Sequence, residues 1–269
     1  MTERKIFKKL INIDDAFKIF YKYYNSIRLN NEKIIINQSN GRVLSQNIFS
    51  QLDVPGFDRA TMDGYAINAE NSFGAKYDKP ISFKIIGESK PGIISKVELK
   101  NYDAVEISTG SPIPIGSNSV VIVENTENCD NNSINIFKPV IPGENIMYAG
   151  SDIMNGELIL RKNTVITPRE IGLIAAIGLK EISVYRKPII SILSTGDELT
   201  EIGKKLVHPK IYDVNSQAII SSLSELGCIA NYVGIVQDDP DIMKQKIINC
   251  LKNSDLILTS GSTSAGAGD

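Results

Sequence analysis

The sequence predicts an α/β plus β fold, in which an open parallel α/β domain follows an elongated N-terminal domain that carries an inserted small β subdomain. After residue 188, short and continuously apolar runs alternate with segments of helical period. Strands and helices that alternate in this way form right-handed crossovers in a parallel sheet. Between residues 53 and 139, strand-like runs are broken by Gly, Pro and Asn without a convincing long helix, which indicates the β subdomain.

The length of the chain supports a division into three parts. A chain of 269 residues suits two or three domains, and its hydrophobic fraction of 42% is enough for a buried core. We expect residues 1–53 and 140–182 to form the elongated N-terminal domain, residues 54–139 the inserted β subdomain, and residues 183–269 the α/β domain.

Composition excludes several classes of protein. The formal charge of −2 argues against a dedicated nucleic-acid binder. No apolar run approaches the roughly 18 residues that a membrane span requires, and the basic N-terminal cluster precedes an amphipathic pattern instead of a signal peptide. We therefore expect a cytoplasmic protein that contacts neither nucleic acid nor membrane.

Histidine and cysteine chemistry is not indicated. The three cysteines show no CxxC spacing, so neither a zinc site nor a disulfide framework is expected. His208 is the single histidine, and a lone histidine in a loop is more often a surface residue than a base. Histidine triads and HExxH zinc sites are excluded.

The first half of the chain begins with a helix and continues mainly in strands. Phe17, Phe20, Tyr24 and Ile27 recur at helical spacing, and Asp14 or Asp15 is expected to cap this helix. Further on, Thr167 and Glu170 form a capping box with Pro168 at the first helical position, and Gly178 is expected to end that helix. The predicted strands are residues 33–36, 43–49, 81–86, 103–107 and 120–123, with a turn at Asn40-Gly41 between the first two.

Three strands and two helices are expected after residue 188. The first helix should start near Asn215 or Ser216 and stop at Gly227, and the second should have Asp239 as its N-cap and Pro240 at its first position. The predicted strands are residues 189–193, 232–236 and 255–259.

The ends of these three strands each deliver a carboxylate, from Glu198, Asp238 and Asp269. Ligands of open α/β sheets bind at the carboxyl ends of the strands. Three carboxylates placed close together repel one another unless a cation joins them, and Mg²⁺ is the natural partner. Gly261 lets backbone N–H groups approach an anion. The same segment offers hydroxyl donors from Ser260, Ser262, Thr263 and Ser264.

Simpler interpretations of the same residues stay open. Asp197 and Asp239 are also typical of an ordinary turn and a helix cap, and a Gly/Ser-rich segment is also typical of a linker. The last loop is neither a Walker A loop nor a GxGxxG fingerprint. The coincidence of three acidic strand ends with one glycine-rich loop favours a ligand site.

Separated motifs along the whole chain resemble the MoeA/gephyrin E-domain family, the molybdopterin molybdenumtransferases. The N-terminal motifs are Val54-Pro55-Gly56-Phe57-Asp58 with Thr61-Met62-Asp63-Gly64-Tyr65-Ala66-Ile67, Ser108-Thr109-Gly110-Ser111-Pro112-Ile113-Pro114-Ile115-Gly116, and Gly150-Ser151-Asp152-Ile153. The α/β motifs are Ser194-Thr195-Gly196-Asp197-Glu198-Leu199, Ile211-Tyr212-Asp213-Val214-Asn215, Gly234-Ile235-Val236-Gln237-Asp238-Asp239-Pro240, and Ser260-Gly261-Ser262-Thr263-Ser264.

The resemblance implies a MoaB/MogA-like α/β domain and Mg²⁺-dependent insertion of molybdate, or tungstate, into adenylylated molybdopterin with release of AMP. It implies that Glu198, Asp238 and Asp269 hold metal and substrate. The expected substrate-binding residues are Thr195, Gly196, Asp197, Asp213, Asn215, Ser260, Gly261, Ser262 and Ser264.

The resemblance also implies a homodimer, in which Asp63, Thr109 and Asp152 of one chain complete the catalytic site of the other. For Asp63, a plain turn before Gly64 is an equally good interpretation of the residues. A molybdopterin adenylyltransferase is an expected partner. The final loop resembles archaeal members, and the family's C-terminal β domain and the end of the α/β domain are expected to be missing.

Two other functions stay open. The α/β domain is shared with molybdopterin adenylyltransferases, so a nucleotide-binding enzyme of that kind is one alternative; stand-alone adenylyltransferases lack the insert that contains Asp63 and Thr109. A non-catalytic scaffold module is the other alternative.

Overall fold

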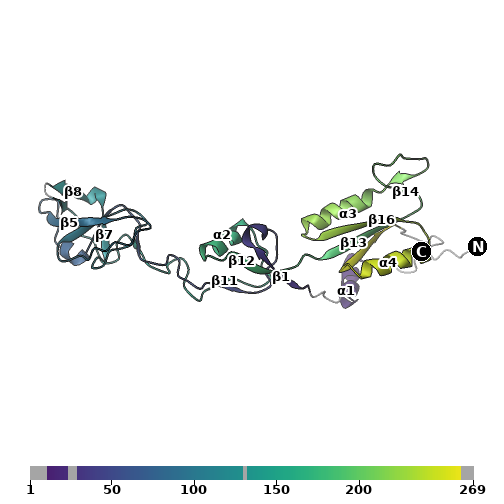
Figure 1. The fold of residues 1–269 in the computed structure, drawn as a ribbon, viewed down its shortest axis with the longest axis horizontal. Helices are drawn as coiled ribbons and strands as arrows, with labels where there is room; N and C mark the ends of the chain where they lie inside the picture. Colours follow the sequence, from purple (N-terminus) through teal and green to yellow (C-terminus); the bar gives the residue numbers. More distant parts are fainter. Residues whose placement is uncertain (1–10, 24–28, 130–131, 262–269) are drawn as a thin grey trace, which may run out of the picture. The chain divides into compact units, whose positions relative to one another are not determined.

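The computed structural model describes residues 11–23, 29–129 and 132–261 (Figure 1). Within these residues the chain forms two compact units. The first comprises residues 1–46, 162–171 and 181–269, and the second comprises residues 47–161 and 172–180. The finer division into three domains stays a prediction.

The N-terminal helix is α1, Ile13–Tyr23. Its amide at Asp15 donates to the side chain of Asn12 over 2.8 Å, so Asn12 fills the capping role expected of Asp14 or Asp15. The two aspartates lie in the first turn instead, where negative charge complements the positive end of the helix dipole. Tyr24 and Ile27 of the expected apolar stripe lie outside the described residues.

An antiparallel pair follows α1 in the first unit. β1 (Asn31–Ile35) pairs with β12 (Glu181–Tyr185), and Gly41 adopts a φ of 74° at the predicted turn. α2 (Pro168–Ala176) has residues in both units, and it begins with the predicted capping box: the amide of Thr167 donates to Glu170 over 2.9 Å. Gly178 has a φ of 74° just after the helix, as a left-handed C-terminal cap requires.

The second unit is built on strands. Among its described residues a mixed sheet has the order β7-β4-β6-β5-β9-β8, in which β5 and β6 are parallel and the other pairs are antiparallel. Gly64 is the first residue of β4, and a Cβ there would come within 1.9 Å of the Val121 carbonyl oxygen. Only glycine permits this close approach of two strands. The bounds are β4 Gly64–Ile67, β5 Ile81–Ser89, β6 Asp103–Ile107, β7 Ser119–Ile122, β8 Thr126–Cys129 and β9 Ser133–Ile136.

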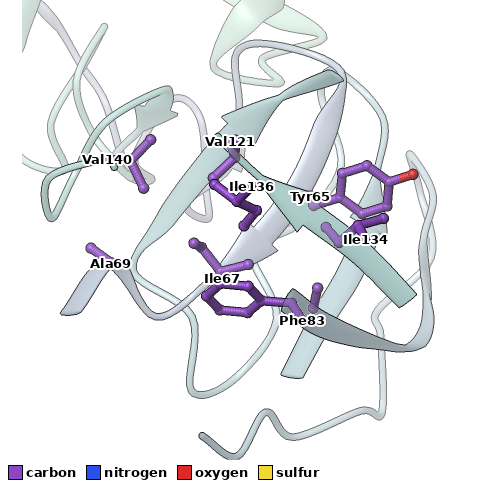
Figure 2. Packing of buried hydrophobic residues seen from close by; sticks show 9 residues of the cluster. Tyr65, Ile67, Ala69, Phe83, Val121, Ile134, Ile136 and Val140 are labelled. Atoms are coloured by element: carbon purple, nitrogen blue, oxygen red, sulfur yellow. The ribbon is translucent and has the colours of Figure 1, made fainter. Parts of the chain in front are cut away.

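One face of this sheet carries a hydrophobic core. Figure 2 shows its packed side chains, which occupy alternate positions along β4 and β9, whereas Ala66 and Val120 belong to a second buried cluster. The packed side chains of the first cluster include Tyr65, Ile67, Phe83, Val121, Ile134, Ile136 and Val140. The predicted strands 81–86, 103–107 and 120–123 are therefore confirmed, with shifts of at most three residues at their ends.

Short two-stranded ladders complete the second unit. β2 (Ile48–Phe49) pairs with β11 (Leu158–Leu160), and β3 (Arg59–Ala60) pairs with β10 (Ile146–Met147), both antiparallel. These ladders bring the segment before Asp63 alongside the segment that contains Asp152. Short 3₁₀ turns are Ile36–Gln38 in the first unit and Ala69–Ser72 and Val123–Asn125 in the second.

The predicted parallel sheet is confirmed in the first unit. Within the described residues its order is β16-β13-β17, with both neighbours parallel to the central strand. The strands are β13 (Ile189–Thr195), β16 (Ile229–Val236) and β17 (Leu256–Ser260). β13 is buried along nearly its whole length, as a continuous apolar run covered on both faces should be.

Two helices cover opposite faces of this sheet, as Figure 1 shows. α3 (Val214–Glu225) packs Leu223 against Ile190 and Ile192, whereas α4 (Pro240–Leu251) packs Cys250 against Leu193 and Val236. Because successive side chains of a strand point to opposite faces, β13 supplies both cores. No helix of the described residues is long and apolar enough to span a membrane.

Candidate ligand site at the switch point of the parallel sheet

The strand order creates a switch point beside β13. The chain leaves β13 through α3 to reach β16 on one side, and then crosses through α4 to reach β17 on the other side. In open α/β sheets with this order, ligands bind beyond the carboxyl ends of the strands where the connections diverge. The loops that follow β13 and β17 therefore form the candidate site.

β13 ends at Thr195, and the loop after it contains Gly196 and Glu198. Thr195 is buried at the strand end, and Gly196 adopts a φ of 140° that side chains rarely allow. A Cβ on Gly196 would lie 2.6 Å from Oε2 of Glu198. The exposed Glu198 side chain thus folds back over the glycine, and its carboxylate stands at the edge of the switch point.

The loop after β17 contacts the same strand end. Ser194 and Ser260 are register partners, and Gly261 follows with a φ of 137°. A Cβ on Gly261 would lie 2.3 Å from both the carbonyl oxygen and Oγ1 of Thr195. Glycine is required here because the two strand-end loops meet backbone to backbone.

Asp213 lies buried beside this strand end as the N-cap of α3. Its Oδ1 accepts from the Ser216 amide over 3.1 Å, and its Oδ2 accepts from the Tyr232 hydroxyl over 2.9 Å. Burial raises the pKa of Asp213, but the donors Ser194, Ser216 and Tyr232 outweigh burial, so the net pKa is lowered. The carboxylate therefore stays ionised and holds the helix start in place.

The same contact acts on Tyr232 in the opposite direction. Burial, and then the hydrogen bond to Asp213, raise the pKa of the Tyr232 hydroxyl, which keeps it a donor. The neighbouring Ser194 Oγ is fully buried and has no hydrogen-bond partner within the described residues. It nevertheless lies close enough to Asp213 to lower the pKa of that carboxyl.

The remaining predicted residues of this domain lie on the same edge or close to it. Asp238 is exposed two residues after β16, whose last residue Val236 pairs with Thr195. Asp197 is exposed in the turn after β13, and Asn215 is exposed in the first turn of α3. Asp239 caps α4 by accepting from the amides of residues 241 and 242, which confirms its simpler interpretation.

Part of the predicted site falls outside the described residues. Ser262, Ser264 and Asp269 belong to that part, so the predicted metal triad of Glu198, Asp238 and Asp269 stays a prediction. Among the residues that the structure describes, no three acidic, histidine or cysteine side chains gather closely enough to hold a metal ion.

In the second unit, Asp63 and Thr109 form a direct pair. Oδ1 of Asp63 accepts from the Thr109 amide over 2.7 Å and from its hydroxyl over 2.9 Å. These two bonds lower the pKa of Asp63, so the exposed carboxylate is an anion at neutral pH. Asp152 is also exposed, and its carboxylate makes no hydrogen bond or ion pair within the described part of the chain.

Three residues around Asp213, namely Ser194, Ser216 and Tyr232, were not among the predicted site residues. Tyr232 lies in a predicted strand, Ser216 marks a predicted helix start, and Ser194 belongs to a motif of the resemblance. The alternation along β16 could have placed Tyr232 on the α3 face, but its meeting with Asp213 depends on the crossover that brings β16 back beside β13.

The chain therefore combines an open α/β domain, with a candidate ligand site, and a β-rich unit. A family model described as the MoeA N-terminal region, domains I and II, matches residues 11–178. A second model, described as a probable molybdopterin binding domain, matches residues 191–269. The chain therefore belongs to the MoeA/gephyrin family.

Curated relatives and a solved structure agree with this membership. Gephyrin from Dictyostelium discoideum is 34% identical over 94% of this chain and 38% of its own length. A molybdopterin molybdenumtransferase from Nostoc is 32% identical over 85% of this chain and 52% of its own length. The crystal structure of a molybdopterin biosynthesis MoeA protein from Pyrococcus horikoshii superposes with a TM-score of 0.88 at 33% identity, covering 95% of this chain and 67% of that one. The chain spans about half the length of the curated relatives it matches.

Proposed function

We propose that this chain carries the molybdopterin-binding part of a molybdopterin molybdenumtransferase, which inserts molybdate into adenylylated molybdopterin and releases AMP. The approach of Gly261 to Thr195 at the switch point carries the proposal, because it lies in the domain that matches the molybdopterin-binding model. Glycines on both sides of the crevice leave backbone N–H groups accessible to phosphate. Thr195, Gly196, Ser260 and Gly261, with Ser262 and Ser264 beyond them, would hold the phosphates.

The donor set on this edge fits Mg²⁺. The carboxylates of Glu198 and Asp238 are exposed and make no hydrogen bond or ion pair among the described residues, and Mg²⁺ prefers such oxygen ligands. Glu198, Asp238 and Asp269 would hold the ion. When bound, it would neutralise phosphate charge and polarise the phosphoryl linkage to AMP.

Other residues of this domain would orient the ligand. Asp213 holds the start of α3 through Ser216 and Tyr232, and so fixes the exposed Asn215 in the first helical turn. Asp197 lies beside Glu198 in the turn after β13. Molybdate, or tungstate in its place, is the oxyanion substrate.

The second unit would supply the rest of the site to a partner copy in a homodimer. Asp63, Thr109 and Asp152 are exposed, and the lowered pKa of Asp63 suits an anionic acceptor instead of a proton donor. A molybdopterin adenylyltransferase in the cytoplasm is the proposed source of the adenylylated substrate.

The test is AMP release by the full-length protein supplied with adenylylated molybdopterin, Mg²⁺ and molybdate. Glu198→Gln and Asp238→Asn should each lower the rate at least about a hundredfold, as loss of a group that stabilises transition-state charge does. Asp241→Asn, which removes an exposed acid three residues away in α4, is the control and should retain activity. No AMP release by the wild type, or equal rates in all variants, would refute the proposed function.

A further inference from the structure

Three aspartates at intervals of five residues organise the second unit. Each of Asp53, Asp58 and Asp63 accepts a backbone N–H from a segment far away in the chain. The donors are Asn155 at 2.8 Å, Ala149 at 2.8 Å and Thr109 at 2.7 Å, respectively. Asp63 is a predicted site residue, whereas Asp53 and Asp58 have no role in the proposed reaction.

The contacts of Asp53 and Asp58 bracket one short segment, residues 149–155. Between the two carboxylates, the Gly150 amide donates to the Pro55 carbonyl over 2.9 Å. The amides of Asp152 and Ile153 donate to the Val54 carbonyl over 2.9 and 3.1 Å. The two remaining amides donate within the segment and its turn, from Ser151 to Tyr148 and from Met154 to Glu157. Every backbone N–H from residue 149 to residue 155 therefore has an acceptor.

Asp152 lies inside this bracketed segment. Its backbone is held at both ends, while its carboxylate is exposed and has no partner among the described residues. Gly150 packs closely against Asp53, since a Cβ at Gly150 would lie 3.1 Å from Oδ1 of Asp53. The φ of Gly150 is 74°, in the left-handed region that favours glycine. The segment is thus built to present one free carboxylate from a fixed backbone.

We propose that Asp53 and Asp58 are positioning residues that fix the backbone around Asp152 and so aim its carboxylate. This inference rests on the proposed function for the part that Asp152 takes in the reaction. Asp53 and Asp58 would act as hydrogen-bond acceptors and not through their charge, since each uses one oxygen to bind one N–H. An asparagine side chain keeps such an acceptor, but an alanine does not.

The difference between the Asn and Ala variants distinguishes a positioning residue from a catalytic one. In the full-length protein, Asp58→Ala should lower the rate of AMP release about ten- to a hundredfold, since misplacement by 1 Å can cost about 10²-fold. Asp58→Asn should restore most of the rate. Asp152→Asn, which removes a charge proposed to face the substrate, should not be rescued. If Asp58→Asn were as inactive as Asp58→Ala, the acceptor role would be wrong.

A double mutant tests whether Asp58 acts through Asp152. If it does, Asp58→Ala should cause little further loss in an Asp152→Asn background, because coupled residues are not additive. Losses that multiply would show that Asp58 acts independently and would overturn the proposal.

Hydrogen exchange gives a readout that needs no activity. Amides of residues 149–155 should exchange faster in Asp58→Ala and Asp53→Ala than in the wild type, and the Asn variants should stay close to the wild type. Amides of the strand Ser119–Ile122 serve as the internal control for global unfolding. Unchanged exchange in the Ala variants would overturn the positioning role, whereas an inactive wild type with the expected exchange pattern would count against the proposed function alone.

Discussion

At the scale of single residues, several carboxylates of this chain are committed to hydrogen bonds with specific donors. Asp63 binds Thr109, Asp213 binds Ser216 and Tyr232, and Asp239 binds the first amides of α4. The bonds to Asp63 and Asp213 lower the pKa of these two acids. Glu198, Asp238 and Asp152 are exposed and make no such bond within the described residues, so their carboxylates are free to contact a ligand.

The Thr109 hydroxyl should control the ionisation of Asp63. In Thr109→Val the backbone N–H bond stays and the hydroxyl bond is lost, so the pKa of Asp63 should rise towards its ordinary value of 3.8. Thr109→Ser retains the hydroxyl and should leave this pKa unchanged. Carboxyl ¹³C NMR titration measures both variants, and equal pKa values in the wild type and Thr109→Val would contradict the prediction.

Asp213 should be important for stability. Asp213→Ala removes the cap of α3 and leaves the half-buried Tyr232 hydroxyl without its acceptor. We expect a loss of about 2–4 kcal/mol in the free energy of unfolding, from a lost cap and an unsatisfied polar group. Urea unfolding at pH 7 measures it.

Two variants serve as controls for Asp213. Asp213→Asn keeps an acceptor and should cost less than Asp213→Ala. In an Asp213→Ala background, Tyr232→Phe should be almost neutral, because the hydrogen bond that it removes is already absent. A full and additive loss from Tyr232→Phe would show that the two side chains are not coupled.

At the scale of elements, local sequence signals explain where the helices start. α4 begins at Asp239 and Pro240, and α2 begins at the capping box of Thr167 and Glu170. The Thr167 hydroxyl and amide, together with Arg169, lower the pKa of Glu170 to about 2. This element therefore has its own pH dependence.

Glu170 should stabilise the protein only while it is ionised. Its folded-state pKa of about 2 lies below the ordinary 4.5, so its contribution is complete above pH 4.5 and is lost as the pH falls towards 2. The difference in unfolding free energy between the wild type and Glu170→Gln should shrink over this range. Urea titrations at pH 7, 4 and 2.5 check this, and a constant difference would contradict it.

At the scale of the whole molecule, each unit depends on contacts between residues far apart in the sequence. In the first unit, Arg186 holds Asp255 through two bonds, Nη1 to Oδ2 at 2.7 Å and Nη2 to Oδ1 at 2.5 Å. Asp255 also accepts the Ile189 amide over 2.8 Å. One carboxylate therefore joins the start of β13 to the start of β17.

Breaking this pair should destabilise the first unit in a pH-dependent way. Arg186→Met should lower the free energy of unfolding at pH 7, because two hydrogen bonds to a charged group are lost. The hydrogen bonds from Arg186 lower the pKa of Asp255 below its ordinary 3.8, so the difference should shrink as the pH falls below that value. Lys204→Met, which breaks an exposed pair with Glu201, is the control and should cost less than about 1 kcal/mol.

The predictable part of the fold was the part encoded locally. The three strands after residue 188, the cap at Asp239 and the capping box at Glu170 were all predicted, because hydrophobic period and capping chemistry depend on neighbours within a few residues. The cap of α1 was assigned to Asp14 or Asp15 instead of Asn12. Asn12, Asp14 and Asp15 each suit a helix start, and local pattern does not choose among them.

The sequence by itself determined the parallel α/β domain, the β-rich unit, the glycine and acid positions at the strand ends, and the motifs of the MoeA/gephyrin family. Only the tertiary structure decided the order β16-β13-β17, the meeting of Gly261 with Thr195, the pairing of Tyr232 with Asp213, and the bracketing of Asp152 by Asp53 and Asp58. These contacts join residues separated by 19 to 102 positions. Their partners are set by how crossovers and ladders bring distant backbone together, which no local pattern specifies.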